Sequence, residues 1–298
     1  DYLENNWTSD NTAVLNLETQ VTEPEGSAEE LANIKDLLGS FTTSFSTSGS
    51  NRCNNVSSGA SHINGTVLYP GEEFSTLDKI SPFTEANGYY PAGSYLNGMV
   101  VDSLGGGICQ VSTTLYNAVL RAELNVTERS PHSMTVHYVD LSEDAAIAGT
   151  YKDFKFVNST EYPIYIEGYT TSDKKITFNI YGKETRDKNR TISFESQMVS
   201  ATPAPTILQE DAGQGIGYKA VSSKGSSGYV AELYKIVKVN GVETDRIKVN
   251  KSTYKGTNRV VTYGTAGDPT LSENLRAAIA AQDEALADAN IAAAVPAQ

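Results

Sequence analysis

The sequence has little of what marks several large protein classes. Its 298 residues include only two cysteines, Cys53 and Cys109, which excludes a disulfide-dense scaffold and any zinc site built on paired cysteines. A disulfide between these two residues would close a long loop, and it is the structural alternative to a reactive thiol. No apolar run reaches the roughly 18 residues that a membrane-spanning helix needs.

Basic residues are scarce as well. The chain has 23 Lys and Arg against 36 Asp and Glu, a formal net charge of −13, and no dense basic stretch. Nucleic acid and anionic lipid both bind to cationic surfaces, so neither is an expected partner. The acidic residues are spread along the chain, which is typical of a soluble surface. We expect a monomer that needs no cofactor and no metal.

The chain also lacks an initiator methionine and a signal peptide, since it begins with Asp1-Tyr2-Leu3. We interpret it as an ectodomain fragment from which an N-terminal anchor or signal has been removed. The predicted location is therefore extracytoplasmic, with membrane contact only through that removed anchor.

Tyrosine is frequent, at 17 residues, alongside many Thr, Ser and Asn residues, and this composition favours β-rich structure. The pattern along the chain predicts four regions: 1–45, 46–187, 188–266 and 267–298. In the first region we expect a strand at 13–17 and a helix from a capping box at Ser27 to Gly39. The Ser/Thr-rich stretch 41–50 is expected to be an extended linker or an edge strand.

Region 46–187 has the pattern of a mainly β domain with at least one buried helix. Apolar residues from Val111 to Ala122 recur at helical spacing after a glycine-rich loop. Runs of β-branched and aromatic residues predict strands at 66–69, 134–139, 154–157, 164–169 and 175–181. The predicted fold class is α+β.

The last two regions have simpler patterns. Region 188–266 alternates short strands with Gly and Ser turns, which predicts a small, elongated all-β module. Its clearest signal is the hairpin turn Asn240-Gly241 between strands at 230–239 and 246–254. The Ala-rich region 267–298 is expected to be a marginal helix or disordered.

The segment Gly105-Gly106-Gly107-Ile108-Cys109-Gln110 carries the clearest chemistry. Three glycines allow positive φ angles and a close approach of backbone to ligand, and a helix begins directly after them. The unpaired N–H groups and partial positive charge of a helix N-terminus favour the thiolate form of Cys109. The same N–H groups are suited to an oxyanion. The oxyanion or substrate-binding residues that we predict are Gly106, Gly107, Ile108, Gln110, Ser112 and Thr113.

A cysteine nucleophile needs a base within hydrogen-bond reach, and the chain has only three histidines. His62 lies far upstream in a Ser/Asn-rich segment. His132 and His137 are separated by an odd number of positions, so in a strand only one would face Cys109, and the residues alone leave the two equal. The group that orients the base is equally open among Asp140, Asp144 and the hydroxyl of Ser133.

The central region also resembles the VanW domain over about residues 50–170. The matching segments are Asn51-Arg52 with Asn55, Asn64-Gly65-Thr66-Val67-Leu68, Pro70-Gly71-Glu72, the run from Gly105 to Asn117, Glu128-Arg129, His132-Ser133 and Asp144-Ala145. Region 188–266 resembles a G-five domain through Tyr254, Gly256 and its strand pattern. Residues 1–45 resemble the end of a peptidoglycan-binding-type domain with its linker.

The resemblance implies a cysteine L,D-transpeptidase of the Gram-positive cell wall. Cys109 would be the nucleophile and His132 the general base, because the recurrent histidine of the family falls at position 132. Ser133 and Asp144 are the candidates for orienting the base. The thiolate would attack the carbonyl that joins the third residue of a peptidoglycan stem to its terminal D-Ala. An amine on another stem would then resolve the acyl-enzyme, whereas attack by water would make the site an L,D-carboxypeptidase.

Two other functions stay open. One is a non-catalytic cell-wall-binding or glycopeptide-resistance accessory module, with a structural Cys109 and a glycine loop that binds a carboxylate or glycan. The other is a cysteine amidase or endopeptidase acting on the same polymer. A partly exposed Cys109 in a groove beside His132 would favour catalysis, whereas a disulfide to Cys53 or an apolar enclosure would favour the accessory module.

Overall fold

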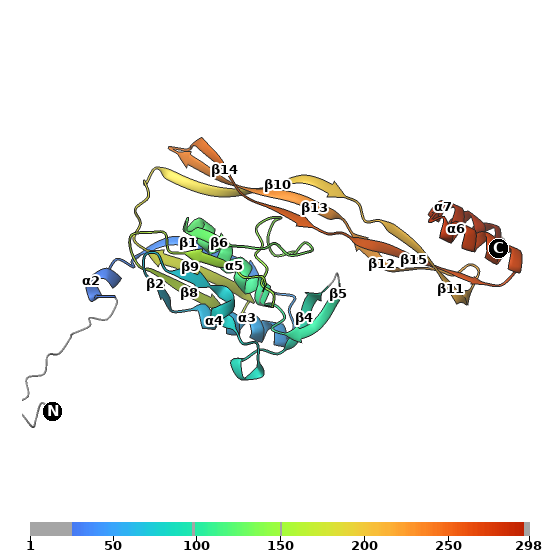
Figure 1. Cartoon of the computed structure of the whole chain (residues 1–298), viewed down its shortest axis with the longest axis horizontal. Coiled ribbons are helices and arrows are strands. Elements are labelled where there is room, and N and C mark those ends of the chain that lie inside the picture. Colours follow the sequence, from blue (N-terminus) through green and yellow to red (C-terminus); the bar gives the residue numbers. More distant parts are fainter. Residues whose placement is uncertain (1–25, 97–98, 150, 295–298) are drawn as a thin grey trace, which may run out of the picture.

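The computed structural model describes residues 26–96, 99–149 and 151–294, which form a sheet-and-helix domain and a long β ribbon (Figure 1). The predicted α+β class is confirmed. No helix in these three ranges is long and apolar enough to cross a membrane.

A four-stranded antiparallel sheet is the foundation of the first domain. Its strand order is β1-β9-β8-β2, with β1 (Asp36–Ser44), β9 (Lys175–Gly182), β8 (Ile164–Thr170) and β2 (Thr66–Leu68). Successive side chains of a strand point to opposite faces, so alternate residues of β8 are buried. Ile164, Ile166 and Phe178 are completely buried and contribute to the domain core.

Two helices pack against this sheet: α3 (Ser50–Ile63) and α5 (Ile108–Arg121). The backbone of α5 passes so close to β1 that a Cβ on Gly39 would lie 2.4 Å from the carbonyl oxygen of Ala118. Only glycine fits this crossing. Every residue of α5 from Gln110 to Leu120 is buried, so the helix lies inside the domain and only its two ends reach the surface.

The buried polar side chains of α5 are hydrogen-bonded to backbone carbonyls. Ser112 Oγ donates to the carbonyl oxygen of Ala145 at 2.6 Å, and Asn117 Nδ2 donates to that of Glu143 at 2.7 Å. Buried polar groups are costly unless they are hydrogen-bonded. These bonds satisfy the helix side chains and fix the backbone on both sides of Asp144.

Smaller elements complete the first domain. They are α2 (Ala28–Leu31), β3 (Glu73–Ser75), α4 (Thr76–Ile80), η1 (Glu85–Asn87), β4 (Pro91–Leu96), β5 (Met99–Leu104), β6 (Asn125–Glu128) and β7 (Lys155–Val157). Strands β3, β7 and β6 form a second sheet, and β4 and β5 pair as a separate two-stranded sheet.

The ribbon consists of two three-stranded sheets in succession. The near sheet has the order β10-β13-β14, from β10 (Arg190–Thr202), β13 (Gly228–Val239) and β14 (Val242–Tyr254). The far sheet has the order β11-β15-β12, from β11 (Thr206–Gly215), β15 (Thr257–Ala266) and β12 (Lys219–Ser226). Helices α6 (Pro269–Ala280) and α7 (Glu284–Ala294) lie at the far end, where Leu275 and Ala278 share a small core with Tyr263.

The near half of the ribbon lies along the first domain, whereas the far half extends beyond it (Figure 1). Leu233 of β13 is completely buried and belongs to the core of the first domain. Glu123, just after α5, accepts hydrogen bonds from Arg190 at 2.7 Å and from Lys235 at 3.0 Å. Apolar burial and charge-assisted hydrogen bonds therefore both join the ribbon to the domain.

Two predicted elements are wrong. The apolar spacing of Leu31, Leu37 and Leu38 fits a helix, but α2 ends at Leu31 and residues 36–44 form strand β1, which joins the main sheet. The sheet thus begins before residue 46, and stretch 41–50 starts as an edge strand. The strand expected at 134–139 is irregular instead, because this stretch pairs with no other strand.

Other expectations have different outcomes. The strand expected at 13–17 lies outside the described residues. The Ala-rich region is helical in α6 and α7. The hairpin turn at Asn240-Gly241 is present, with positive φ angles of 53° and 81°.

Candidate active site

Cys109 is the second residue of α5, directly after the three glycines. Gly107 has a φ of 107°, in the region that favours glycine. A Cβ on Gly106 would lie 2.2 Å from the carbonyl oxygen of Ala92. The glycines therefore let the chain turn tightly against β4 and start a helix with Cys109 in its first turn.

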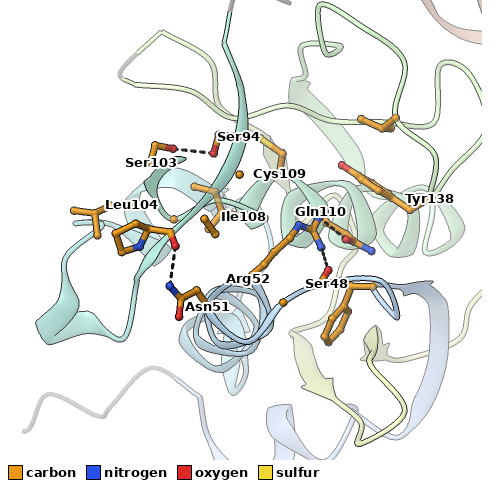
Figure 2. Close-up of a pocket in the computed structure, with 18 of the residues that line it drawn as sticks. Ser48, Asn51, Arg52, Ser94, Ser103, Leu104, Ile108, Cys109, Gln110 and Tyr138 are labelled. Atoms are coloured by element: carbon orange, nitrogen blue, oxygen red, sulfur yellow. Dashed lines mark hydrogen bonds between the residues drawn. The ribbon is translucent and has the colours of Figure 1, made fainter. Parts of the chain in front are cut away.

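Cys109 lines a pocket of about 1200 Å³. The pocket walls come from residues 44–52, 91–94, 103–105, 107–110, 136–138 and 147–149, together with Phe83 and His132. Figure 2 shows that these walls combine the start of α3, the β4–β5 pair and the first turn of α5. Both cysteines are free and of intermediate exposure, so Cys109 is not in a disulfide, and its Sγ donates to the carbonyl of Ile147 at 3.3 Å.

His132 connects Cys109 to a buried carboxylate. Its Nδ1 lies 2.7 Å from Oδ2 of Asp144, and its backbone N–H donates to the same oxygen at 2.6 Å. Asp144 is 1% exposed. The carboxylate holds the ring in the tautomer that carries a proton on Nδ1, so Nε2 is the nitrogen free to exchange a proton with a neighbour.

The pKa values of these three groups favour an ion pair between thiolate and imidazolium. Burial raises the pKa of Cys109, but contact with His132 outweighs burial and leaves that pKa lowered. Burial lowers the pKa of His132, but the bonds to Asp144 and Cys109 outweigh burial and raise that pKa to about 9. The pKa of Asp144 stays below its usual range despite burial, because His132 and Arg129 stabilise its charge. The thiolate is the nucleophilic form of cysteine.

Two further donors hold the other oxygen of Asp144. Arg129 Nη2 lies 3.0 Å from Oδ1, and the hydroxyl of Tyr254 donates to Oδ1 at 2.5 Å. Burial raises the pKa of Tyr254 to about 12, so this hydroxyl keeps its proton at neutral pH. Tyr254 is the last residue of β14, so the ribbon contributes directly to the group that orients His132.

Comparison with known proteins gives the domain assignment. The VanW family model ("VanW like protein") matches residues 51–181, and the G5 domain model matches residues 195–266. The chain carries a VanW-like domain followed by a G5 domain. The resemblance predicted from the sequence is thereby confirmed.

Curated relatives match the first part of the chain. It is 38% identical over 144 residues to the uncharacterized protein YoaR of Bacillus subtilis, which is 48% of this chain and 48% of that protein. It is 28% identical over 138 residues to the vancomycin B-type resistance protein VanW of Enterococcus faecalis, covering 44% and 49% of the two chains. The chain thus spans about half the length of these relatives.

Solved structures of G5 domains are similar to part of the chain. The G5 domain structure of IgA1 protease is 24% identical, with a TM-score of 0.21, and covers 28% of this chain and 100% of that chain. The HP0197-G5 crystal structure is 21% identical, with a TM-score of 0.18, and covers 25% and 97%.

The predicted oxyanion and substrate residues divide into two groups. Ser112 and Thr113 are 0% exposed, bond the carbonyl of Ala145 and do not line the pocket, so the expectation that they contact substrate is corrected. The reason is that α5 enters the core after its first turn. Gly106 is also buried, and its N–H donates to the carbonyl of Ser103 at 3.2 Å.

At the start of α5, fewer backbone N–H groups are free than the sequence predicted. The N–H groups of Ile108 and Gln110 donate to the carbonyls of Gly105 and Gly107 at 3.1 and 3.0 Å. The N–H groups of Gly107 and Cys109 form no hydrogen bond within the described ranges. These two amides are the candidates that the structure leaves for an oxyanion.

The remaining candidates lie in different places. Ser133 is exposed, and its carbonyl accepts from the N–H of Lys255 at 2.7 Å, whereas Asp144 contacts His132. His137 is exposed on the pocket wall. His62 pairs with Tyr89 at 3.1 Å and does not line the pocket, and Asp140 is exposed.

Sequence reasoning did not assign roles to Arg52, Arg129, Tyr138 or Tyr254. Tyr138 lines the pocket, and its pKa is raised, first by burial and then by the charge of Cys109. Arg52, Arg129 and Tyr138 fall inside segments that match the VanW domain, which was a usable signal. Tyr254 lies 110 positions from Asp144 in another domain, so no local pattern connects the two.

Proposed function

We propose that this protein is a cysteine L,D-transpeptidase of peptidoglycan. The observation that carries the proposal is the placement of Cys109 and His132 on the wall of one open pocket, with the His132 ring hydrogen-bonded to Asp144. VanW and G5 domains are typical of secreted, cell-wall-associated proteins, and this supports the choice of polymer.

The first half-reaction would transfer an acyl group to sulfur. The Cys109 thiolate attacks the carbonyl that joins the third stem residue to its terminal D-Ala, and the N–H groups of Gly107 and Cys109 receive the oxyanion. The His132 imidazolium gives its Nε2 proton to the leaving amine as the C–N bond breaks. D-Ala departs, and the third residue remains bound to Cys109 as a thioester.

The second half-reaction would restore the thiolate. The side-chain amine of a third residue on another stem attacks the thioester, and neutral His132 takes the proton that this amine loses. The C–S bond breaks, and Cys109 leaves as the thiolate beside imidazolium. The product is a cross-link between two third-position residues. Water in place of the amine would yield a tripeptide, which is the carboxypeptidase reaction.

The test is incubation of the chain with purified disaccharide-tetrapeptide, followed by mass spectrometry. We expect a dimer whose mass reflects the loss of one D-Ala, and no dimer with Cys109→Ala. His137→Ala is the matched control for His132→Ala, because both histidines line the pocket but only His132 bonds Asp144. Loss of His132 should lower the rate about 10³-fold or more, in the range seen when one member of such a triad is removed.

Two results would contradict the proposal. An unchanged dimer yield with Cys109→Ala would exclude Cys109 as the nucleophile and would favour an accessory module. Equal losses in His132→Ala and His137→Ala would show that the base is assigned wrongly.

A further inference from the structure

Arg52 differs from every other arginine of the chain. The chain has eight arginines, and all of them lie within the described ranges. Seven form an ion pair with a carboxylate: Arg121, Arg129, Arg186, Arg190, Arg246, Arg259 and Arg276. Arg52 forms none with any residue that the structure describes. In a chain with a net charge of −13, a guanidinium without an acidic partner needs an explanation.

Neutral groups hold the Arg52 side chain in a fixed position. Its Nη1 donates to Ser48 Oγ at 2.7 Å, and its Nη2 donates to Gln110 Oε1 at 2.8 Å (Figure 2). Gln110 is itself fixed, since its Nε2 donates to Thr43 Oγ1 and to the carbonyl of Ser44, both at 2.9 Å. A guanidinium has five N–H donors, so three of them have no partner among these contacts.

Arg52 lies beside the turn that positions Cys109. Its Cγ would be 2.9 Å from a Cβ placed on Gly107, which is two residues before Cys109. The charge of Arg52 lowers the pKa of Tyr138, whereas the charge of Cys109 raises it. The charges that act most on Cys109 belong to His132 and Asp144, so the thiolate already has a cationic partner. Arg52 is therefore not required as the cation beside the thiolate, and we look for its partner among the ligands that the pocket could bind.

The pocket has an unusual distribution of charge for this protein. None of the described residues that line it is Asp or Glu, although the chain contains 36 acidic residues. Its ionisable cationic or basic side chains are Arg52, His132 and His137. The Cys109 thiolate is balanced by His132, so the charge that remains in the pocket is that of Arg52. A cationic site favours an anionic ligand, and a guanidinium is suited to a carboxylate.

We propose that Arg52 binds the terminal carboxylate of the donor stem peptide, that is, the carboxylate of the D-amino acid that leaves; this inference rests on the proposed function. In such a donor the carboxylate is one Cα away from the nitrogen of the scissile amide. Arg52 on one side of the α5 turn and Cys109 on the other would hold these two groups of the substrate at once. The site would thus select a peptide that ends one residue after the scissile bond.

Binding measurements test the subsite without turnover. The probe proteins are the full chain with Cys109→Ala and the same chain with Arg52→Gln added. The probe ligands are a stem tetrapeptide with a free C-terminus, the same peptide amidated at its C-terminus, and the same peptide amidated at its internal carboxylates instead. Two further proteins carry Arg52→Lys or Arg246→Gln in the Cys109→Ala chain, and isothermal titration calorimetry gives a dissociation constant for each pair of protein and peptide.

With Arg52 present, we expect the free acid to bind about 10- to 100-fold more tightly than the C-terminal amide, as is typical for hydrogen bonds to charged groups. The internally amidated peptide should bind like the free acid. Arg52→Gln should bring the ratio of acid to C-terminal amide close to 1, and Arg52→Lys should restore part of it. Arg246→Gln removes the same charge from the exposed surface of the G5 domain, and it should leave the ratio unchanged.

Equal binding of the free acid and the C-terminal amide while Arg52 is present would overturn the subsite, whether or not the Arg52→Gln chain folds. The subsite would also be overturned if Arg52→Gln left the preference for the free acid over the C-terminal amide unchanged. The same holds if the affinity depended on the internal carboxylates, or if no peptide bound. Because Cys109→Ala removes turnover, the outcome is independent of the dimer assay. A chain that forms dimers without this preference loses only the subsite, and a chain that shows the preference without forming dimers loses only the transpeptidase proposal.

Discussion

The VanW-like domain and the G5 domain place their charged groups in different environments. In the VanW-like domain, the side chains of Arg129 and Asp144 are 6% and 1% exposed. In the G5 domain, Arg246 and Glu195 pair at a similar distance but are 38% and 46% exposed. Buried charges are stable only with a complete set of partners, whereas exposed pairs contribute little. An ion pair of this kind therefore fixes a reactive site in the VanW-like domain, whereas in the G5 domain it lies on the solvent-exposed surface.

The junction is the exception to this contrast. Tyr254 belongs to the G5 domain but is 3% exposed, and its hydroxyl bonds Asp144 and receives the N–H of Ser142 at 2.7 Å. Arg129 also reaches Ser252, at 2.9 Å. One end of the G5 domain is thus part of the support for His132, while its far end extends away from the VanW-like domain (Figure 1).

Among the variants that compare the two domains, the largest effect is expected from Asp144→Asn. His132 would lose the charge that raises its pKa to about 9, and the ring would lose its fixed tautomer. The rate should fall by about 10³- to 10⁴-fold, as for the corresponding change in a Ser-His-Asp triad.

The pH profile of the same variant gives a second readout. In the unchanged protein, His132 must be protonated to release D-Ala, so activity should fall as the pH rises through about 9. In Asp144→Asn the pKa of His132 should drop, and this alkaline limb should move to lower pH. A limb that stays in place would show that Asp144 does not set the charge of His132.

An intermediate effect is expected from Tyr254→Phe, which removes one hydroxyl from the junction. Asp144 would keep three donors, and the N–H of Ser142 would lose its partner. We expect kcat to fall about 10-fold and the free energy of unfolding to fall by about 1–3 kcal/mol. Tyr263→Phe is the matched control, because Tyr263 bonds Asp288 at the far end of the G5 domain. A loss of kcat in this control would mean that the G5 domain acts through its overall stability.

The smallest effect is expected from Arg246→Gln on the exposed face of the G5 domain. Its partners Glu195 and Glu243 are both solvent-accessible, so water replaces the lost bonds. Thermal unfolding and dimer formation should match those of the unchanged chain. A clear decrease in melting temperature would contradict the contrast between the two domains.

The sequence predicted the parts of the site that depend on neighbouring residues. Three glycines and a helical apolar pattern were enough to locate α5 and Cys109 at its start. Strand β1 was missed because the spacing of its apolar residues also fits a helix, and pairing with β9 decides between the two. Ser112 and Thr113 follow Cys109 closely, but the direction of α5 into the core removes them from the pocket.

Groups that meet only through the tertiary fold could not be predicted from local pattern. Asp144 was one of three open choices for orienting the base until the bonds of α5 to Ala145 and Glu143 placed its loop. Tyr254 comes from another domain. Arg52 lies within a matched segment, yet only the tertiary contacts reveal that it pairs with no acidic residue in the described ranges.

The most direct test of the central claim is to locate the acyl group on the enzyme. The unchanged chain is mixed with disaccharide-tetrapeptide, quenched in acid within one turnover and digested for peptide mapping by mass spectrometry. Cys53 is the internal control, since it is also a free, partly exposed cysteine, but it does not line the pocket. We expect an adduct with the mass of the donor without D-Ala on Cys109 and none on Cys53. Release of D-Ala without an adduct on Cys109, or with the adduct on Cys53, would contradict it.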